Sequence, residues 1–180
     1  IKECDWSSDV CSSDLRLAPA QRQRIVVVQQ CRPEDLERAR AAYAEIGVPA
    51  ELDRFFEDLP ARLAASNLAI CRSGASTVAE LTVIGRPAIL VPYPHATDDH
   101  QTANAGAVAD AGAGWLIDNA AFTPAVLAER LSALLADPAP LDRAAAAAWN
   151  LGRPDAAERL ADLVMKLAPA NGNQTTEKAA

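Results

Sequence analysis

Positive charge is scarce in this sequence. Its 180 residues carry 17 lysines and arginines against 24 aspartates and glutamates, which gives a net charge of -7. Proteins that bind a nucleic-acid backbone depend on clustered Lys and Arg that release counterions. We therefore expect no nucleic-acid partner.

Long apolar runs and paired cysteines are missing as well. No run approaches the roughly 20 residues that cross a bilayer, and the first residues lack the blocks of a secretory signal. The four cysteines include no C-x-x-C pair, and Cys31 and Cys71 stand far apart. Neither a disulfide framework nor a zinc site is indicated. The sequence predicts a cytoplasmic protein.

Both ends of the sequence lack structural periodicity. Residues 1–15, "IKECDWSSDVCSSDL", repeat Ser-Ser-Asp and fit neither a helical nor a strand period. We interpret them as a non-native leader that resembles the translation of a sequencing adapter joined to a truncated reading frame, the alternative being a disordered native tail. Residues 169–180 are polar and predict a disordered tail. Residues 16–168 then form one domain.

Between these ends, short β-branched runs alternate with longer helical patterns. The predicted strands lie at 25–29, 51–55, 68–72, 88–92 and 114–118. The predicted helices lie at 33–46, 77–84, 99–111, 124–135 and 154–167. Such alternation specifies a parallel sheet with helices on both faces. The predicted fold class is therefore α/β, with a doubly wound, Rossmann-like parallel sheet.

The stretch "RSGASTVAE", residues 72–80, joins a predicted strand to a predicted helix. Gly74 permits close backbone approach, and the helix that opens at Ser76 and Thr77 presents unpaired N–H groups. Those donors and the helix dipole favour an anion, a diphosphate in particular. The alternative is a T-x-x-E capping box formed by Thr77 and Glu80, which needs no ligand. Taken alone, the motif favours the capping box.

A second polar stretch, "HATDDHQTANA", follows the next predicted strand. Parallel strands end at a common edge, so both loops lie where ligands bind in such folds. His100 and Gln101, at or beside the first helical turn, offer donors and acceptors that suit sugar hydroxyls.

This second stretch also has plainer interpretations. Its first turn can be a solvated helix start, with Asp98 or Asp99 as an ordinary N-cap. A metal site made of His95, Asp98, Asp99 and His100 is conceivable on ligand type. We do not expect a metal, because the sequence has only two histidines and the spacing matches no common site.

Together, "CRSGASTVAELTVIGRPAILVPYP", "DDHQTANA" and "AGAGWLID" resemble the donor-binding half of the MurG family. These bacterial glycosyltransferases add N-acetylglucosamine to lipid I to form lipid II in peptidoglycan synthesis. The resemblance covers roughly residues 16–168. It implies the C-terminal lobe of a two-lobed GT-B enzyme, with UDP-N-acetylglucosamine as donor and no cofactor.

The resemblance assigns donor contacts to four residues of the first motif. It implies that Ala75, Ser76 and Thr77 contact the diphosphate through backbone N–H and hydroxyl groups. It implies that Glu80 accepts hydrogen bonds from the ribose hydroxyls.

Three further contacts are implied elsewhere. Gln101 matches the second member of the family's "QQ" or "HQ" pair, which contacts hydroxyls of the N-acetylglucosamine ring, and His100 takes the place of the first. Phe56, in "RFFEDLP", matches a position whose backbone meets the uracil. Its alternative role is that of an apolar residue packed at a strand end, and both can hold.

The sequence also departs from the family pattern. It has no counterpart of the N-terminal acceptor lobe with its catalytic base, nor of the "GGSQGA"-type loop that opens the donor lobe. We therefore expect the first strand to be missing, which leaves one side of the sheet unpaired. No catalytic residue is expected in this fragment, and no activity of the fragment alone. Lipid I and the cytoplasmic face of the bacterial inner membrane would meet the missing lobe of the parent enzyme.

Two other functions and one structural alternative stay open. The chain can be a non-catalytic domain that binds sugar nucleotides, or part of another GT-B enzyme such as a glycolipid galactosyltransferase or a UDP-N-acetylglucosamine epimerase. The helix at 154–167 either reaches toward the absent lobe or packs on the sheet. Its apolar stripe comprises Leu160, Leu163, Val164 and Leu167.

Overall fold

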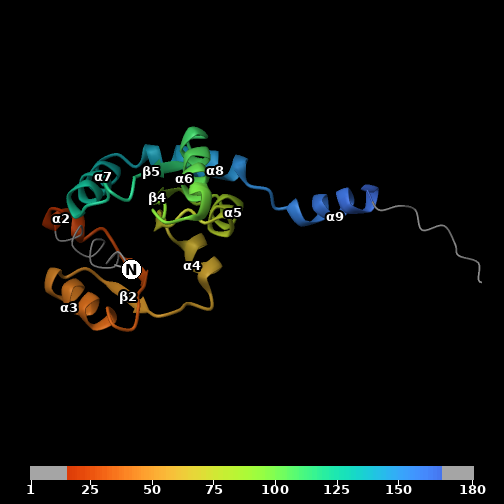
Figure 1. The fold of residues 1–180 in the computed structure, drawn as a ribbon. Helices are drawn as coiled ribbons and strands as arrows, with labels where there is room; N and C mark the ends of the chain where they lie inside the picture. Colours follow the sequence, from red (N-terminus) through yellow and green to blue (C-terminus); the bar gives the residue numbers. More distant parts are fainter. Residues whose placement is uncertain (1–15, 168–180) are drawn as a thin grey trace, which may run out of the picture.

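A computed structural model describes residues 16–167 (Figure 1). The predicted leader at 1–15 and tail at 169–180 lie outside the described residues. The strands are β1 (Val27–Gln30), β2 (Ala50–Asp53), β3 (Ala69–Cys71), β4 (Ala88–Leu90) and β5 (Gly114–Leu116). The helices are α2 (Pro19–Arg22), α3 (Leu36–Ile46), α4 (Leu59–Ala65), α5 (Ala75–Ile84), the 3-10 turn η1 (Thr97–Asp99), α6 (His100–Asp110), α7 (Pro124–Ala136), α8 (Ala139–Leu151) and α9 (Ala156–Leu167).

The alternation of strands and helices agrees with the prediction. All five predicted strands and all five predicted helices are present, with shifted ends, while α2, α4, α8 and η1 were not predicted. Among residues 16–167, no helix combines the length and apolar character needed to cross a membrane.

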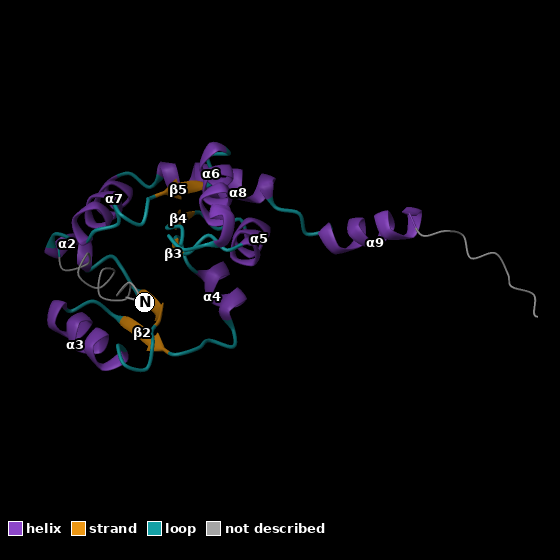
Figure 2. Ribbon diagram, in the orientation of Figure 1, coloured by secondary structure: helices purple, strands orange, loops and turns teal. Residues whose placement is uncertain are grey.

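The strands form two parallel sheets, and the expectation of a single sheet is wrong. One sheet pairs β1 with β2, and the other has the order β3-β4-β5 (Figure 2). In the doubly wound order 3-2-1-4-5-6, the second and fourth strands flank the first and do not touch. If β1 to β5 are strands two to six of that order, β1 and β3 cannot pair. The gap that a missing first strand leaves would therefore lie between the two sheets, and not at one side of a single sheet as expected. We call this gap the break between the sheets.

The β1–β2 sheet has its own apolar core against α3. Ala39 and Tyr43 of α3 pack with Leu52 of β2, and the Tyr43 hydroxyl donates to Gln29 Oε1 at 2.7 Å. Helix α3 ends at Gly47, whose φ of 67° is the left-handed conformation that glycine adopts without strain. The predicted end of this helix at residue 46 is confirmed, whereas the helix begins at Leu36, three residues later than predicted, and Asp35 makes no side-chain capping bond.

The β3–β4–β5 sheet is covered on both faces, as the predicted fold class requires. One face packs against α5, α6 and α8, which contribute Leu81, Ala105, Val108 and Ala148. The other face packs against α7 through Leu127. The first residue of β5, Gly114, must be a glycine, because a Cβ at this position would collide with the main-chain oxygen of Ala88. The strand β4 is buried, and its carboxyl end lies at the sheet edge that carries the two polar motifs, residues 72–80 and 95–105.

Helix α9 extends away from the rest of the domain (Figure 1). None of its residues is buried, and Leu160, Leu163 and Val164 are 63%, 53% and 56% exposed. The alternative of a terminal helix packed on the sheet is therefore wrong. An apolar stripe on an otherwise charged helix is stable only against a partner surface.

Candidate functional site

The site is built around the turn from β3 into α5. Gly74 is the N-cap residue, no side chain caps the helix, and the first helical backbone bond runs from Val78 N to Gly74 O at 2.9 Å. The N–H groups of Ala75, Ser76 and Thr77 therefore have no partner among the described residues. Donors of this kind at a helix start, together with the helix dipole, favour negative charge.

The capping-box interpretation of this turn is wrong. Thr77 is the third residue of α5 and Glu80 the sixth, so neither stands where a capping box requires it. The helix begins earlier because Gly74 already has the extended φ and ψ of an N-cap residue, at -60° and 149°.

Neither backbone nor packing requires glycine at position 74. Its φ of -60° suits any residue, and a Cβ there would meet only Thr77 Oγ1 at 3.7 Å, an ordinary contact. The missing side chain therefore leaves room beside the unpaired N–H groups. A ligand can approach the backbone closely there.

Ser73 ties the first motif to the second. This residue is fully buried, and its hydroxyl donates to the main-chain oxygen of Gln101 at 2.8 Å. The amide Nδ2 of Asn104 donates in turn to the main-chain oxygen of Ser73 at 3.0 Å. The expectation that both motifs share one sheet edge is confirmed. Sequence reasoning missed Ser73 and Asn104, although Asn104 follows Gln101 by about one helical turn.

The side chain of Gln101 is held in a fixed orientation. Its Oε1 accepts a hydrogen bond from the backbone N–H of Tyr93 at 3.0 Å, in the loop after β4. That bond leaves Nε2 as the donating end of the amide. The Nε2 group and the second lone pair of Oε1 remain available, so the donor and acceptor role expected from the sequence stays a prediction.

The start of α6 is strained. Asp98 and Asp99 have φ values of 51° and 52°, a left-handed conformation that costs on the order of 1 kcal/mol or more per residue. Asp99 occupies the N-cap position as one alternative proposed, but its carboxylate accepts from the Thr102 hydroxyl at 2.6 Å and caps no backbone N–H. His100 is exposed in the first turn. Residues 16–167 contain no group of three or more His, Cys, Asp or Glu that could hold a metal ion.

Arg72 connects three loops at this edge and was missed in the sequence. Its Nη1 donates to the main-chain oxygens of Val91 and Pro92 at 3.1 and 2.9 Å, and to Asn119 Oδ1 at 2.7 Å. The loops that follow β3, β4 and β5 are thus fixed by one guanidinium. The sequence signal was an arginine directly after a buried strand.

Glu80 lies further along α5, and Phe56 follows β2 in the sequence. Glu80 is exposed on α5, one turn after Ser76 on the same helix face and roughly 6 Å further along the axis. Phe56 lies after β2 and is only 7% exposed, with the Arg62 guanidinium 4.2 Å from its ring centre. The packing role of Phe56 is confirmed, while its backbone contact with uracil stays a prediction.

The thiol nearest to the site belongs to Cys71. Cys71 ends β3, and burial raises the pKa of its thiol to about 12. A thiol must ionise to attack a substrate, so this shift disfavours Cys71 as a nucleophile near neutral pH. The edge therefore presents hydrogen-bond donors and acceptors that suit an anion and hydroxyl groups.

Residues 8–160 match the model of the glycosyltransferase family 28 C-terminal domain. The chain is 60% identical over 154 residues to a UDP-N-acetylglucosamine–N-acetylmuramyl-(pentapeptide) pyrophosphoryl-undecaprenol N-acetylglucosamine transferase of Paramagnetospirillum magneticum. It is 61% identical over 163 residues to the Rhodospirillum centenum enzyme of that name. These matches cover 86% and 91% of the chain, but only 42% and 41% of the relatives.

Solved structures show the same relationship. The crystal structure of MurG from Acinetobacter baumannii matches with a TM-score of 0.74 and 34% identity, over 89% of this chain and 49% of that one. The glycosyltransferase of kitacinnamycin matches with a TM-score of 0.65 at 21% identity, which bears on the fold alone.

Proposed function

The chain belongs to the family of the glycosyltransferase family 28 C-terminal domain, and we propose that it binds the UDP-N-acetylglucosamine donor of a longer N-acetylglucosamine transferase. The observation that carries the proposal is the set of unpaired N–H groups at the start of α5, tied through Ser73 to Gln101. The relatives' name states the donor and the transferred sugar. The chain spans about two fifths of their length, so the complete reaction needs further polypeptide.

The diphosphate of the donor would lie against the first turn of α5. The N–H groups of Ala75, Ser76 and Thr77 would donate to its oxygens, with the Ser76 and Thr77 hydroxyls as further donors. Ala75 and Ser76 are exposed, so a ligand can reach them. The open space at Gly74 would let the phosphates approach the backbone.

The nucleoside and the sugar would extend in two directions from the diphosphate. Glu80, on the same face of α5 as Ser76, would accept from both ribose hydroxyls. The uracil would meet the backbone at Phe56. Gln101 would donate through Nε2 to a hydroxyl of the N-acetylglucosamine ring, with His100 beside it.

The proposed reaction is an inverting displacement at the anomeric carbon. A hydroxyl of the acceptor attacks this carbon, while the bond from the carbon to the UDP oxygen breaks. Negative charge then grows on the departing diphosphate. The dipoles at the start of α5 already point there and stabilise the transition state without reorienting.

The general base and the acceptor would come from other parts of the enzyme. The relatives' name gives a pyrophosphoryl-undecaprenol acceptor. A lipid of that kind resides in a membrane, so we propose that the parent enzyme works as a peripheral protein on the cytoplasmic face. The exposed stripe on α9 supports a contact with an adjoining lobe. Residues 16–168 would thus be one lobe of a GT-B enzyme.

The proposal is tested by calorimetric titration of the chain with UDP-N-acetylglucosamine and with UDP-galactose. We expect the first donor to bind more tightly. The Glu80→Ala variant should bind both donors more weakly, and the Gln101→Ala variant should lose the preference between them. Glu129→Ala, an exposed change on α7, is the control.

Two outcomes would contradict the proposal. If a chain that circular dichroism shows to be folded binds neither nucleotide sugar, it contains no donor site. If UDP-galactose binds more tightly, the chain belongs to a galactosyltransferase. Separately, lipid II formation by the chain alone would show that the base lies within it.

A further inference from the structure

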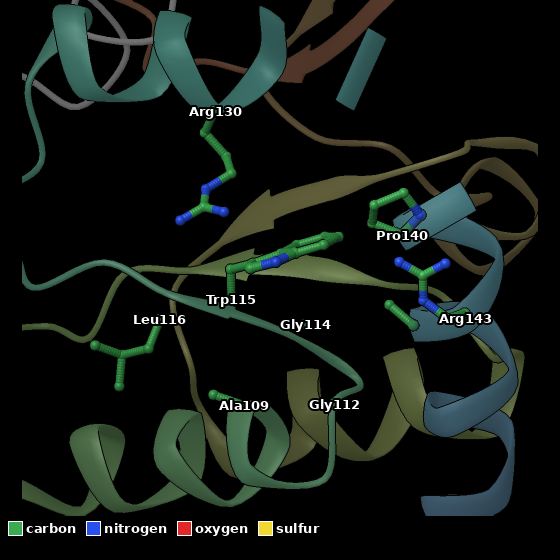
Figure 3. Close-up of a pocket in the computed structure, with 9 residues that line it drawn as sticks. Ala109, Gly112, Gly114, Trp115, Leu116, Arg130, Pro140 and Arg143 are labelled. Carbon is green, nitrogen blue, oxygen red and sulfur yellow. The ribbon is translucent and has the colours of Figure 1, made fainter. Parts of the chain in front are cut away.

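A second candidate site lies along the outer edge of β5 (Figure 3). It is a hollow of about 440 Å³. The lining residues used in the argument are Gly114, Trp115, Leu116, Arg130 and Arg143. The hollow also includes Gly112, which precedes β5, whereas the donor loops follow the carboxyl ends of β3 and β4. It is therefore separate from the proposed donor site.

The strand β5 has one unpaired edge. It ends the β3-β4-β5 order, so only β4 pairs with it among the described residues. Ile117 N donates to Leu90 O at 3.0 Å. The backbone N–H and C=O groups of Ile117 and Trp115 therefore point toward β4. Because backbone groups alternate in direction along a strand, the N–H and C=O of the buried Gly114 and the half-buried Leu116 point away from β4. Such groups are a template for an extended peptide.

Two arginines from different helices reach this edge. Arg130 comes from α7 and Arg143 from α8, and both guanidinium groups point toward the hollow at Trp115 (Figure 3). Neither forms an ion pair with another described residue, although the chain has a net charge of -7. Guanidinium groups bind carboxylates through paired hydrogen bonds. The hollow is thus complementary to negative charge.

We propose that the outer edge of β5 docks an extended acidic segment of a partner protein. The segment would add as a strand beside β5, with its backbone bonded to Gly114 and Leu116. Its carboxylates would pair with Arg130 and Arg143, and an apolar side chain would cover the half-buried Trp115 ring. A free anion could bind to the two arginines, but it could not form the backbone hydrogen bonds of an added strand.

The arrangement of the two arginines sets the spacing of the acidic residues. Helices α7 and α8 cover opposite faces of the sheet. Successive side chains of a strand also point to opposite faces. The two carboxylates should therefore be one or three residues apart in the docked segment, whereas a spacing of two would direct both to one face.

The test uses the full 180-residue chain and fluorescein-labelled peptides of eight residues. The main probe carries adjacent Asp and Glu between Val and Thr residues, and the control probe carries Asn and Gln instead. We expect the acidic probe to bind at least tenfold more tightly. The double variant Arg130→Gln/Arg143→Gln should lose this difference, and Arg159→Gln on α9 should keep it.

A second measurement separates strand addition from charge attraction alone. Hydrogen exchange should show that the acidic probe protects the amides of Gly114 and Leu116. Equal binding of the two probes, binding by the double variant, or binding without this protection would each overturn the proposal. So would binding to vesicles of anionic phospholipid without binding to the acidic peptide. Unfolding curves of all variants check that the fold is retained.

Discussion

The hydroxyl of Ser73 donates to the main-chain oxygen of Gln101 at 2.8 Å, and this bond holds the start of α5 beside the start of α6. Both residues lie at the carboxyl edge of the three-stranded sheet. The bond joins the turn proposed to bind the diphosphate to the residue proposed to contact the sugar. Ser73 is completely buried, so its hydroxyl is shielded from solvent.

Replacing Ser73 with Ala should weaken donor binding and lower the free energy of unfolding by about 0.5 to 1.5 kcal/mol, because one buried hydrogen bond is lost while the Gln101 oxygen keeps its bond within α6. Urea unfolding and calorimetric titration measure the two effects. Thr82→Val is the control, since Thr82 also has a buried hydroxyl, but it bonds only to carbonyls within α5. Donor binding that falls equally in both variants would argue against a specific role for Ser73.

Replacing Gly74 with Ala should leave the fold intact and reduce donor affinity about tenfold. The methyl group meets no close neighbour but enters the space proposed for the diphosphate. The stability cost should stay below about 1 kcal/mol, as expected for Ala at an N-cap. Gly106→Ala, within α6 and with no atom within 4 Å of the added Cβ, should keep full affinity. Unchanged affinity of the Gly74 variant would place the diphosphate elsewhere.

Replacing Arg72 with Lys should lower the free energy of unfolding by about 1.5 to 3 kcal/mol. One ammonium group cannot reproduce the guanidinium geometry that reaches Val91, Pro92 and Asn119. The control Arg40→Lys changes an exposed pair with Glu37 and should cost less than about 0.5 kcal/mol. Urea unfolding of both variants tests this. Equal stability losses would show that the three-loop contact contributes little.

Stability should fall above about pH 9 through the burial of Cys71. The pKa of its thiol is raised from 9.0 to about 12 in the folded state, so at intermediate pH the unfolded chain loses a proton that the folded chain keeps. The free energy of unfolding should decrease by about 1.4 kcal/mol per pH unit over this range.

Urea unfolding at pH 8, 9 and 10 measures this dependence in the wild type and in Cys71→Ala. Other groups titrate in both proteins, so the difference between the two slopes isolates the thiol. Identical slopes would show that Cys71 ionises freely. Peptide-resolved mass spectrometry should also find Cys71 unreactive toward iodoacetamide at pH 8.

The sequence predicted much of the local structure because the signals were local. The Gly47 stop of α3 and the β-branched strands depend on neighbouring residues alone. Helix α8 was missed because its run of alanines carries little periodicity. Its burial depends on Ala144 and Ala148 packing close to other elements.

The site was predicted in outline but not in its connections. Loops at one sheet edge predicted the turn at Ser76 and Thr77 and the place of Gln101, whereas Ala75 was implied only by the family resemblance. The T-x-x-E pattern misled, because an N-cap is defined by backbone conformation, and Gly74 provides it. The roles of Arg72 and Ser73 depend on partners 19 to 47 residues away, which no local pattern records.

The two sheets have separate apolar cores, so we expect the two parts of residues 16–167 to differ in stability. The unit of β1, α3 and β2 is anchored before it by Gln21 and Arg24 of the α2 segment, which bond to Ser132 and Leu135 of α7. After it, α4 packs against α5. With its ends held, this unit can unfold as a closed loop while the larger unit stays native. Its local opening would cost less than global unfolding, and it would re-form at high effective concentration.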